Sequence, residues 1–373
     1  MIKRKAINAI MKKFGDKKAI VIKGARQVGK TTLLKTMFES DDSALFLNGD
    51  EPDVQNIFEN ATSTLLKQIL GNKKNIIIDE AQRIKNIGLK LKLITDSIPD
   101  VKLFVSGSSS LDLSNKINEP LTGRKWEYMM HPLSFGEMVE HHGLLDEKRL
   151  IEHRLVFGYY PEIVTNAGSE KEILKQLSDS YLYKDIFMWE QVKKPEKLVK
   201  LLQALAYQIG SQVSYTELSR LCGLDIKTVE RYILLLEQCF VIFRLSSFSR
   251  NLRNELKFSK KIYFYDNGIR NSLIADFSLA RTRRDIGGLW ENFLVSERKK
   301  KNDYDEKWCN SWFWRTVEQK EIDYLEEADG KISAFEFKWN ENAKYKIPKQ
   351  FRDAYPDVLQ KTISPNNVED FLL

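Results

Sequence analysis

One stretch of the sequence, residues 19–34, constrains the fold of this chain more than any other. It contains Gly24, four further residues and then Gly29, Lys30 and Thr31, which fit the pattern G-x-x-x-x-G-K-[ST] without a mismatch. The apolar run before the motif predicts a buried strand, and TTLLKTMF after it predicts a helix. Glycines let backbone N–H groups close around phosphate oxygens, and a helix N-terminus adds the positive end of its dipole. The stretch therefore predicts a phosphate-binding loop.

A loop of this kind is expected to bind ATP together with Mg²⁺. We expect Lys30 to reach the β- and γ-phosphates and the hydroxyl group of Thr31 to bind the metal ion. The residues expected around the phosphates are those of the loop and the start of the helix: Gly24, Ala25, Arg26, Gln27, Val28, Gly29, Lys30, Thr31 and Thr32. The alternative is a glycine-containing turn between a strand and a helix that binds no ligand.

The next part of the chain alternates between strand and helix patterns. Apolar runs at 44–48, 75–79 and 101–105 predict strands, whereas the pattern is helical up to about residue 70 and again from 84 to 98. The second of these runs is unbroken and β-branched, which is typical of a strand covered on both faces of a parallel sheet. The alternation predicts an α/β fold with a doubly wound parallel sheet.

Acidic residues follow one predicted strand at the edge where such sheets bind their ligands. Asp79 and Glu80 lie at the end of the β-branched run, at the same edge as the phosphate loop. We expect Asp79 to hold Mg²⁺ through a water molecule and Glu80 to orient or deprotonate the attacking water. Ser106, at the end of the next strand, is a candidate for a hydrogen bond to the γ-phosphate. The alternatives are a solvated acid pair at a helix start and an ordinary turn at the serine.

Four stretches follow one another along the chain and are considered as a set: GARQVGKTTLL, IIIDEAQ, FVSGSSS and LTGRKWEYMMHPLSFGEM. With these stretches the chain resembles the prokaryotic AAA-type ATPases that carry a C-terminal domain of unknown function. FGYYPE matches the glycine-glycine-aromatic-proline-glutamate stretch of that family except at Phe157, and YLYKDI, residues 181–186, also matches. The resemblance covers nearly the whole chain and implies a P-loop ATPase joined to a nucleic-acid-type module.

Arg124 matches a Gly-Arg pair of the same family. The resemblance implies that its guanidinium group neutralises charge on the γ-phosphate, either in its own site or in the site of a neighbouring copy. Together with Lys30 and Glu80, Arg124 completes the set of expected catalytic residues. The alternative for Arg124 is a salt bridge to the pair Asp79 and Glu80.

Residues 197–253 have the pattern of a winged helix-turn-helix. Two helical stretches are joined by a short glycine turn and followed by a strand pair. In DNA-binding proteins of this shape the first turns of the second helix face the major groove, and here they carry Lys227, Thr228 and Arg231. The stretch from 244 to 270 adds seven basic residues against two acidic ones, so we expect this region to bind DNA. The alternative is a module that contacts only proteins.

The last part of the chain contains a second set of charged residues. Glu291 lies near the start of a helix, Asp323 follows on a strand, and Glu336 and Lys338 share one face of an alternating strand. The set resembles restriction-endonuclease-like domains, often written PD-(D/E)xK, although Ile322 stands in place of the proline. The resemblance implies a second Mg²⁺ site held by the three carboxylates, with Lys338 polarising water or a phosphodiester. The alternative is a binding module without nuclease activity.

Composition limits the class of protein further. Hydrophobic residues make up 42% of the chain and charged residues 30%, and no apolar run is long enough for a membrane span, so we expect no membrane partner. The three cysteines form no C-x-x-C pair, and the basic N-terminus lacks the apolar centre of a signal peptide, so we expect a cytoplasmic protein. The formal charge of +7 favours polyanionic partners.

Three domains are expected from these patterns. They are an AAA-like ATPase domain with a helical lid (1–190), a winged helix-turn-helix (191–255) and an α/β endonuclease-like domain (256–373). The first hypothesis for function is an ATP-hydrolysing switch protein that associates with DNA through its C-terminal modules. The second is a signalling NTPase whose C-terminal half is a platform for a protein partner or a second copy of the chain. The third is an ATP-regulated, metal-dependent nuclease.

Overall fold

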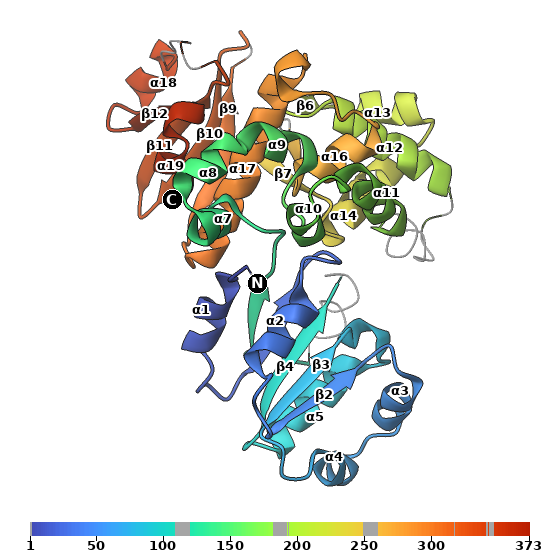
Figure 1. Ribbon diagram of the computed structural model, residues 1–373. Helices are drawn as coiled ribbons and strands as arrows, with labels where there is room; N and C mark the ends of the chain where they lie inside the picture. The colour runs from blue at the N-terminus through green and yellow to red at the C-terminus, as the bar shows by residue number, and fades with distance from the viewer. Residues whose placement is uncertain are drawn as a thin grey trace. The chain divides into compact units, whose positions relative to one another are not determined.

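The computed structural model contains two compact units, and both are drawn in Figure 1. The smaller unit consists of Arg4–Pro132 with Gln238–Phe240, and the larger unit of Met1–Lys3, Leu133–Glu237 and Val241–Leu373. The residues that the structure describes are 2–108, 120–181, 192, 194–248, 260–316, 318–340, 342 and 347–373.

The smaller unit is built around a parallel sheet of five strands in the order β2-β3-β4-β1-β5. The strands are β1 (Ala19–Lys23), β2 (Ala44–Asn48), β3 (Asn75–Asp79), β4 (Lys102–Gly107) and β5 (Lys125–Met129). The β-branched run Ile76–Ile78 is fully buried because the sheet is covered on both faces. The predicted α/β fold with a parallel sheet is confirmed. β5 has no apolar run, so its sequence pattern gave no strand prediction.

Short helices precede and connect these strands. They are α1 (Ala6–Lys12), α2 (Lys30–Met37), α3 (Pro52–Glu59), α4 (Ser63–Leu70), the 3-10 turn η1 (Ala81–Arg83) and α5 (Ile87–Ser97). Thr62 caps α4, since its side chain accepts a hydrogen bond from the backbone N–H of Leu65 at 3.2 Å. The apolar faces of α3, α4 and α5 pack against the sheet in one core that contains Phe58, Leu66 and Leu91.

The larger unit contains a mixed sheet of seven strands in the order β12-β11-β10-β9-β7-β8-β6. The strands are β6 (Gln212–Val213), β7 (Ile242–Ser247), β8 (Lys260–Phe264), β9 (Asn310–Arg315), β10 (Glu321–Ala328), β11 (Lys331–Phe337) and β12 (Leu359–Ile363). β7 pairs with β8 on one side and with β9 on the other. One sheet therefore joins strands from both sides of position 255/256, the expected boundary between the second and third domains.

The helices of the larger unit pack on this sheet and on one another. They are α7 (Phe135–His142), α8 (Leu144–Arg149), α9 (Ile151–Phe157), α10 (Pro161–Thr165), α11 (Glu170–Tyr181), α12 (Pro195–Tyr207), α13 (Tyr215–Cys222), α14 (Ile226–Gln238), α16 (Asn267–Leu273), η3 (Ala280–Thr282), α17 (Ile286–Tyr304), α18 (Lys349–Ala354), η4 (Pro365–Asn367) and α19 (Glu369–Leu372). α17 carries Trp290 and Phe293 into a core shared with α7, α9 and the strands β9 to β12. Residues 133–164, part of the stretch 133–190 that the sequence pattern assigned to a helical lid, therefore share a core with the C-terminal strands.

The FGYYPE stretch links α9 to α16. The Asp266 carboxylate accepts hydrogen bonds from the backbone N–H groups of Tyr159 at 2.7 Å and Ile269 at 3.2 Å. A Cβ atom at Gly158 would lie 2.0 Å from Asp266 Oδ1, so glycine is required where the two segments meet. In this structure the stretch therefore stabilises packing within the larger unit. The other matching stretch, YLYKDI, lies outside the described residues except for Tyr181.

The helix pair expected in 197–253 is present as α13 and α14. α13 ends at Gly223, whose φ of 61° is left-handed. The Asp225 carboxylate accepts hydrogen bonds from the N–H group of Thr228 at 2.9 Å and from its hydroxyl group at 2.6 Å. Val229 and Ile233 are fully buried, as their spacing predicts. The assignment as a winged helix stays a prediction.

Candidate functional site

The phosphate loop between β1 and α2 depends on its two glycines. A Cβ atom at Gly24 would lie 2.1 Å from the backbone oxygen of Met130, so only glycine fits where these segments approach. Gly29 has a φ of 96° and caps the N-terminus of α2 in a left-handed conformation. These requirements explain the G-x-x-x-x-G spacing, because one glycine allows a close approach and the other turns the chain into the helix.

Lys30 and Thr31 begin α2 and point to different partners. Lys30 is 5% exposed, and its Nζ donates hydrogen bonds to the backbone oxygens of Gly24 at 2.9 Å and Ala25 at 2.7 Å. The hydroxyl group of Thr31 donates to Asp79 Oδ2 at 2.6 Å. The lysine therefore lies across the loop, whereas the threonine faces the carboxylate at the end of β3.

Asp79 and Glu80 lie at the carboxyl end of β3, beside the end of β4. The Ser106 hydroxyl group donates to Asp79 Oδ1, and the backbone N–H of Glu80 donates to Ser106 Oγ at 3.4 Å. Glu80 has a left-handed backbone, and its Oε2 accepts a hydrogen bond from Gln82 Nε2. Thr31, Asp79 and Ser106 thus form one hydrogen-bonded chain. We call Lys30, Thr31, Asp79, Glu80 and Ser106 the phosphate-loop edge.

The chemistry of this edge suits Mg²⁺ and a triphosphate. A hydroxyl oxygen and a carboxylate oxygen that lie 2.6 Å apart are the hard oxygen ligands that Mg²⁺ prefers. The N-terminus of the eight-residue helix α2 provides the donors and the positive dipole end that favour phosphate. The residues present therefore fit both expected cofactors.

Two residues at this site had no signal in the sequence. The guanidinium group of Arg4 is buried and donates to the backbone oxygens of Val28 and His131, both at 2.6 Å. Gln82 contacts Glu80 and also donates to Ser108 Oγ at 3.0 Å. Arg4 lies twenty residues before Gly24 in a basic segment that contains no motif, so its contact with the loop could not be predicted locally.

Arg124 lies immediately before β5, and its side chain is 44% exposed. Its Nε donates to Asp96 Oδ1 at 2.7 Å, so its ion pair in the structure is with α5. The alternative interpretation, a salt bridge to Asp79 and Glu80, is wrong. A half-exposed guanidinium group in a surface ion pair contributes little to stability.

The charged residues predicted in the last part of the chain come together in the larger unit. Glu291 lies on α17, Asp323 on β10 and Glu336 on β11. The backbone N–H of Phe337 donates to Asp323 Oδ2 at 2.8 Å, and Lys338 Nζ donates to Glu336 Oε1 at 2.7 Å. We call Glu291, Asp323 and Glu336, with their lysine partners, the carboxylate cluster.

Lys261 on β8 also belongs to this cluster, and the sequence gave no sign of it. It is 1% exposed, and its Nζ lies 2.7 Å from Glu291 Oε1 and also pairs with Glu321. The Tyr263 hydroxyl group donates to the same Glu291 oxygen at 2.6 Å. Burial lowers the pKa of Lys261, but the charges of Glu291, Glu321 and Asp323 outweigh it and raise the pKa.

The pKa of Asp323 is also raised, but here burial contributes to the rise instead of opposing it. Burial, together with the negative charges of Glu291 and Glu336, raises the pKa of its carboxyl group well above the ordinary value, although Lys261 opposes this. Among the described residues, no group of three or more His, Cys, Asp and Glu side chains has the geometry to hold a metal ion. The predicted residues therefore converge, but the buried Lys261 and the partly exposed Lys338 supply the positive charge, and the metal-ligand role stays a prediction.

The basic residues assigned to DNA binding differ in their exposure. Lys227 and Arg231 are exposed on α14, with the exposed Glu230 between them. In the stretch 244–270, Lys261 lies in the carboxylate cluster and Arg270 is buried, bonded to Ala206 O and paired with Asp285. The interpretation of these two residues as phosphate contacts is wrong, and residues 249–259 lie outside the described part of the chain.

The parallel sheet, the phosphate loop and its acidic edge together define a P-loop NTPase fold. The chain matches family models described as an AAA domain over residues 16–139, a domain of unknown function (DUF8612) over 148–280 and a domain of unknown function (DUF4143) over 286–368. The AAA match supports ATP binding and hydrolysis by the first part of the chain.

Relatives in other organisms are similar over most of the chain. An uncharacterized protein of Methanocaldococcus jannaschii is 25% identical, with 95% of this chain and 83% of the relative covered. An uncharacterized protein of Mycobacterium tuberculosis is also 25% identical, with 86% of this chain and 70% of the relative covered. The solved structure of a Walker-type ATPase of Pyrococcus abyssi matches with a TM-score of 0.50 at 14% identity, covering 74% of this chain and 96% of that one. At this identity the likeness shows the fold.

No helix among the described residues is long and apolar enough to cross a membrane.

Proposed function

We propose that this protein is a Mg²⁺-dependent ATP-hydrolysing switch protein that associates with DNA through its larger unit. The observation that carries the ATPase part is the hydrogen-bonded chain of Thr31, Asp79 and Ser106 beside the phosphate loop. This chain holds a metal-ligating hydroxyl group and carboxylate together at the edge where Lys30 lies across the loop. The AAA family match supports the same reaction.

Each residue of the phosphate-loop edge has a distinct role in this proposal. Lys30 exchanges the carbonyl groups of the loop for the β- and γ-phosphates, and Thr31 and Asp79 hold Mg²⁺, which neutralises phosphate charge when bound. Glu80 orients the attacking water and accepts its proton, and its contact with Gln82 fixes the carboxylate. Ser106 has one hydroxyl hydrogen, which it now donates to Asp79, and in this proposal it donates that hydrogen to the γ-phosphate instead.

Arg124 is proposed to act on the γ-phosphate in the site of a neighbouring copy. Its half-exposed ion pair with Asp96 supports this, because a surface pair is readily exchanged for a stronger contact with phosphate. A mixture of Arg124→Ala and Lys30→Ala proteins would then regain part of the activity that each lacks. No gain on mixing would leave only a role within one chain.

The ATPase proposal is tested by separating binding from hydrolysis. Lys30→Ala removes the phosphate contact and is expected to abolish nucleotide binding, whereas Glu80→Gln is expected to bind ATP but to hydrolyse it on the order of 100-fold more slowly. Lys35→Ala, on the exposed side of the same helix, is the control. Calorimetric ATP binding and phosphate release measure both steps. Wild-type turnover by Glu80→Gln would show that another group activates water.

The DNA part of the proposal rests on Lys227 and Arg231, which are exposed on α14. Each phosphate contact releases counterions, so Lys227→Glu with Arg231→Glu is expected to weaken duplex binding and to flatten its dependence on salt. Fluorescence anisotropy with a labelled duplex, titrated with salt, measures both quantities. Unchanged affinity and slope would favour the rival function, a signalling NTPase that uses the larger unit as a protein-interaction platform.

A second candidate function, an ATP-regulated and metal-dependent nuclease, is favoured by the convergence of Asp323, Glu336 and Lys338. In this function the carboxylates hold Mg²⁺ or Mn²⁺ and Lys338 polarises water or the phosphodiester. The full chain incubated with linear, circular and single-stranded DNA and Mn²⁺ tests it. Cleavage that survives Lys338→Ala would come from a contaminant.

A further inference from the structure

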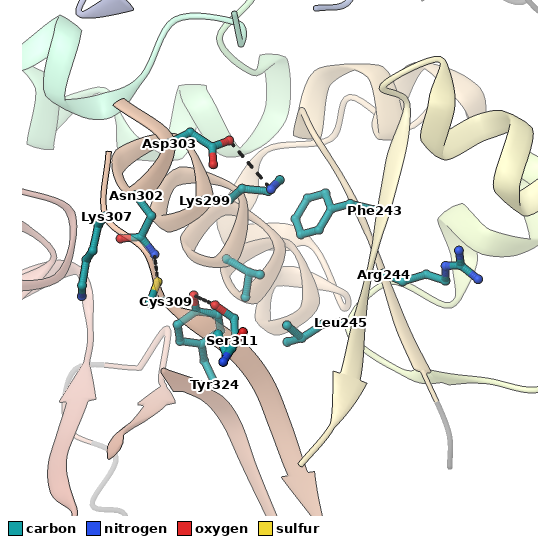
Figure 2. Close-up of a pocket in the computed structure, with 12 residues that line it drawn as sticks. Phe243, Arg244, Leu245, Lys299, Asn302, Asp303, Lys307, Cys309, Ser311 and Tyr324 are labelled. Atoms are coloured by element: carbon teal, nitrogen blue, oxygen red, sulfur yellow. Dashed lines mark hydrogen bonds and ion pairs between the residues drawn. The ribbon is translucent and has the colours of Figure 1, made fainter. Parts of the chain in front are cut away.

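A cavity interrupts the seven-stranded sheet of the larger unit between β7 and β9 (Figure 2). In the described part of the chain these strands pair only at Ser246↔Trp312 and Ser247↔Phe313. Before those pairs, the space between β7 and β9 opens into a cavity of about 270 Å³ that is also lined by α17 and by Lys307 and Cys309, which follow it. The volume is close to the lower end of small-molecule pockets, which begin at about 300 Å³, so one planar ring with its substituents fits.

Two lysines stand at this cavity with part of their side chains in solvent. Lys299 Nζ lies 3.8 Å from Asp303 and 6.0 Å from the centre of the Phe243 ring, and Lys307 pairs with Glu326. Figure 2 shows the Arg244 side chain turned away from the other lining residues, and it is bonded to Glu237. The positive charge at the cavity therefore comes from the two lysines, and a phosphate group receives it by replacing Asp303 and Glu326 as their partners.

The wall of the cavity contains a buried polar group that lacks a partner. Asn302 is 7% exposed, and its Nδ2 donates to Cys309 Sγ at 3.2 Å, whereas its Oδ1 accepts no hydrogen bond from any described residue. Burial and the nearby Glu326 raise the pKa of the Cys309 thiol to about 11, so the sulfur is a neutral thiol. That oxygen has no accessible surface, so a nucleobase, which brings an N–H donor, pairs with it only after the Asn302 amide group turns toward the cavity.

Trp308 stands next to the cavity with its indole ring in solvent. It lies between Lys307 and Cys309, which both line the cavity, and it is 98% exposed, the largest exposed fraction among the large hydrophobic side chains that the structure describes. Packing against the described residues therefore covers almost none of this ring, so its burial does not stabilise the fold. An exposed aromatic ring beside basic side chains is the arrangement on which the bases of single strands stack.

We propose that the cavity and Trp308 bind single-stranded nucleic acid: one unpaired base enters the cavity, its phosphate contacts Lys299 and Lys307, and the next base stacks on Trp308. This inference rests on the proposed association with nucleic acid, but it uses no residue of α14. A free mononucleotide carries the same base and phosphate chemistry and differs in having no second base for Trp308.

The test uses the full chain and 12-nucleotide single strands of dA and dT, followed by fluorescence anisotropy. Trp308→Ala is expected to weaken binding by about 5-fold to 150-fold, since stacking of one base contributes about 1–3 kcal/mol. Lys299→Gln with Lys307→Gln is expected to flatten the salt dependence. The matched control is Tyr207→Ala, which removes another strongly exposed aromatic ring, on α12, and should change nothing. Circular dichroism checks that every variant is folded.

The outcomes separate this inference from the proposed function. Loss of single-strand binding in Trp308→Ala, with duplex binding retained, supports the inference. Single-strand binding that persists when Lys227→Glu with Arg231→Glu removes duplex binding also supports it, because α14 is then not the single-strand site. Single-strand binding that is equal in wild type and Trp308→Ala overturns it, even where the duplex contact of α14 holds. Cytidine monophosphate is tested in the Lys30→Ala background, which removes the phosphate loop as a competing site. Mononucleotide binding as tight as that of the oligonucleotides would also overturn the single-strand proposal.

Discussion

The phosphate-loop edge and the carboxylate cluster are both predicted Mg²⁺ sites, yet the two regions balance their charges in different ways. At the phosphate-loop edge, the carboxylate of Asp79 is bonded to the hydroxyl groups of Thr31 and Ser106, which are neutral. Lys30 lies on backbone carbonyl groups. The acidic and basic groups there are thus held apart, and each can exchange its neutral partner for a charged ligand.

In the carboxylate cluster, the acidic groups are already paired with lysines. Lys261 contacts Glu291 and Glu321, and Lys338 contacts Glu336. A cation that enters this cluster has to compete with ammonium groups, one of which is buried. The comparison teaches that convergence of carboxylates does not by itself define a cation site, because the charge of the partners decides what the site can accept.

The largest effect that sharpens this comparison is expected from Lys261→Met. Removal of the ammonium group leaves Glu291 and Glu321 without their buried partner, which costs about 3–5 kcal/mol of the free energy of unfolding. Urea unfolding of the full chain, followed by tryptophan fluorescence, measures the loss. Lys260→Met, the adjacent residue of β8 outside the cluster, is the control and should stay within about 0.5 kcal/mol. A loss no larger than that of the control would show that the cluster does not depend on its internal cation.

An intermediate effect is expected from Asp79→Asn at the phosphate-loop edge. The amide keeps a hydrogen-bonding oxygen for Thr31 but lacks the charge that holds Mg²⁺, so ATP hydrolysis should fall on the order of 100-fold. The free energy of unfolding should change little, because the partners of Asp79 are neutral hydroxyl groups. Steady-state phosphate release and urea unfolding measure the two quantities, with the exposed Asp100→Asn as control. A large loss of stability would remove the difference between the two regions.

The phosphate-loop edge could be predicted closely because its signal is local. The motif is contiguous in sequence and Gly29 turns the chain locally into α2, although Gly24 is required by the approach of the distant Met130. The acids follow at the end of a recognisable apolar strand. Arg4 and Gln82 were missed, since a basic residue near the N-terminus and a glutamine after an acid pair have no pattern that distinguishes them from solvated residues.

The larger unit was harder to predict because its contacts are distant in sequence. The spacing of Asp323, Glu336 and Lys338 was readable, but Lys261 lies on another strand, and a lysine in a strand looks the same whether it is buried or solvated. The pairing of β7 with β9, across more than sixty residues, also leaves no local trace. Strand patterns predict the elements, whereas the order of strands in a mixed sheet depends on tertiary packing.

The smallest effect, and the one that could break the comparison, is expected from Asp323→Asn. Burial and the charges of Glu291 and Glu336 raise the pKa of Asp323 in the folded state. Its contribution to stability is therefore fully present below the unfolded value of about 3.9 and is lost as pH rises through the raised folded pKa. Asparagine cannot ionise, so the variant avoids this loss and should gain roughly 2–4 °C in Tm at high pH if the change is about 1 kcal/mol. Thermal unfolding across pH, without divalent ions and with Mn²⁺, measures this gain in Tm.

Parallel pH curves of wild type and Asp323→Asn would show that Asp323 ionises independently of folding. A Tm gain with Mn²⁺ in wild type alone would make the cluster a cation site after all, because an added ion would then outcompete Lys261 and Lys338 for the same carboxylates.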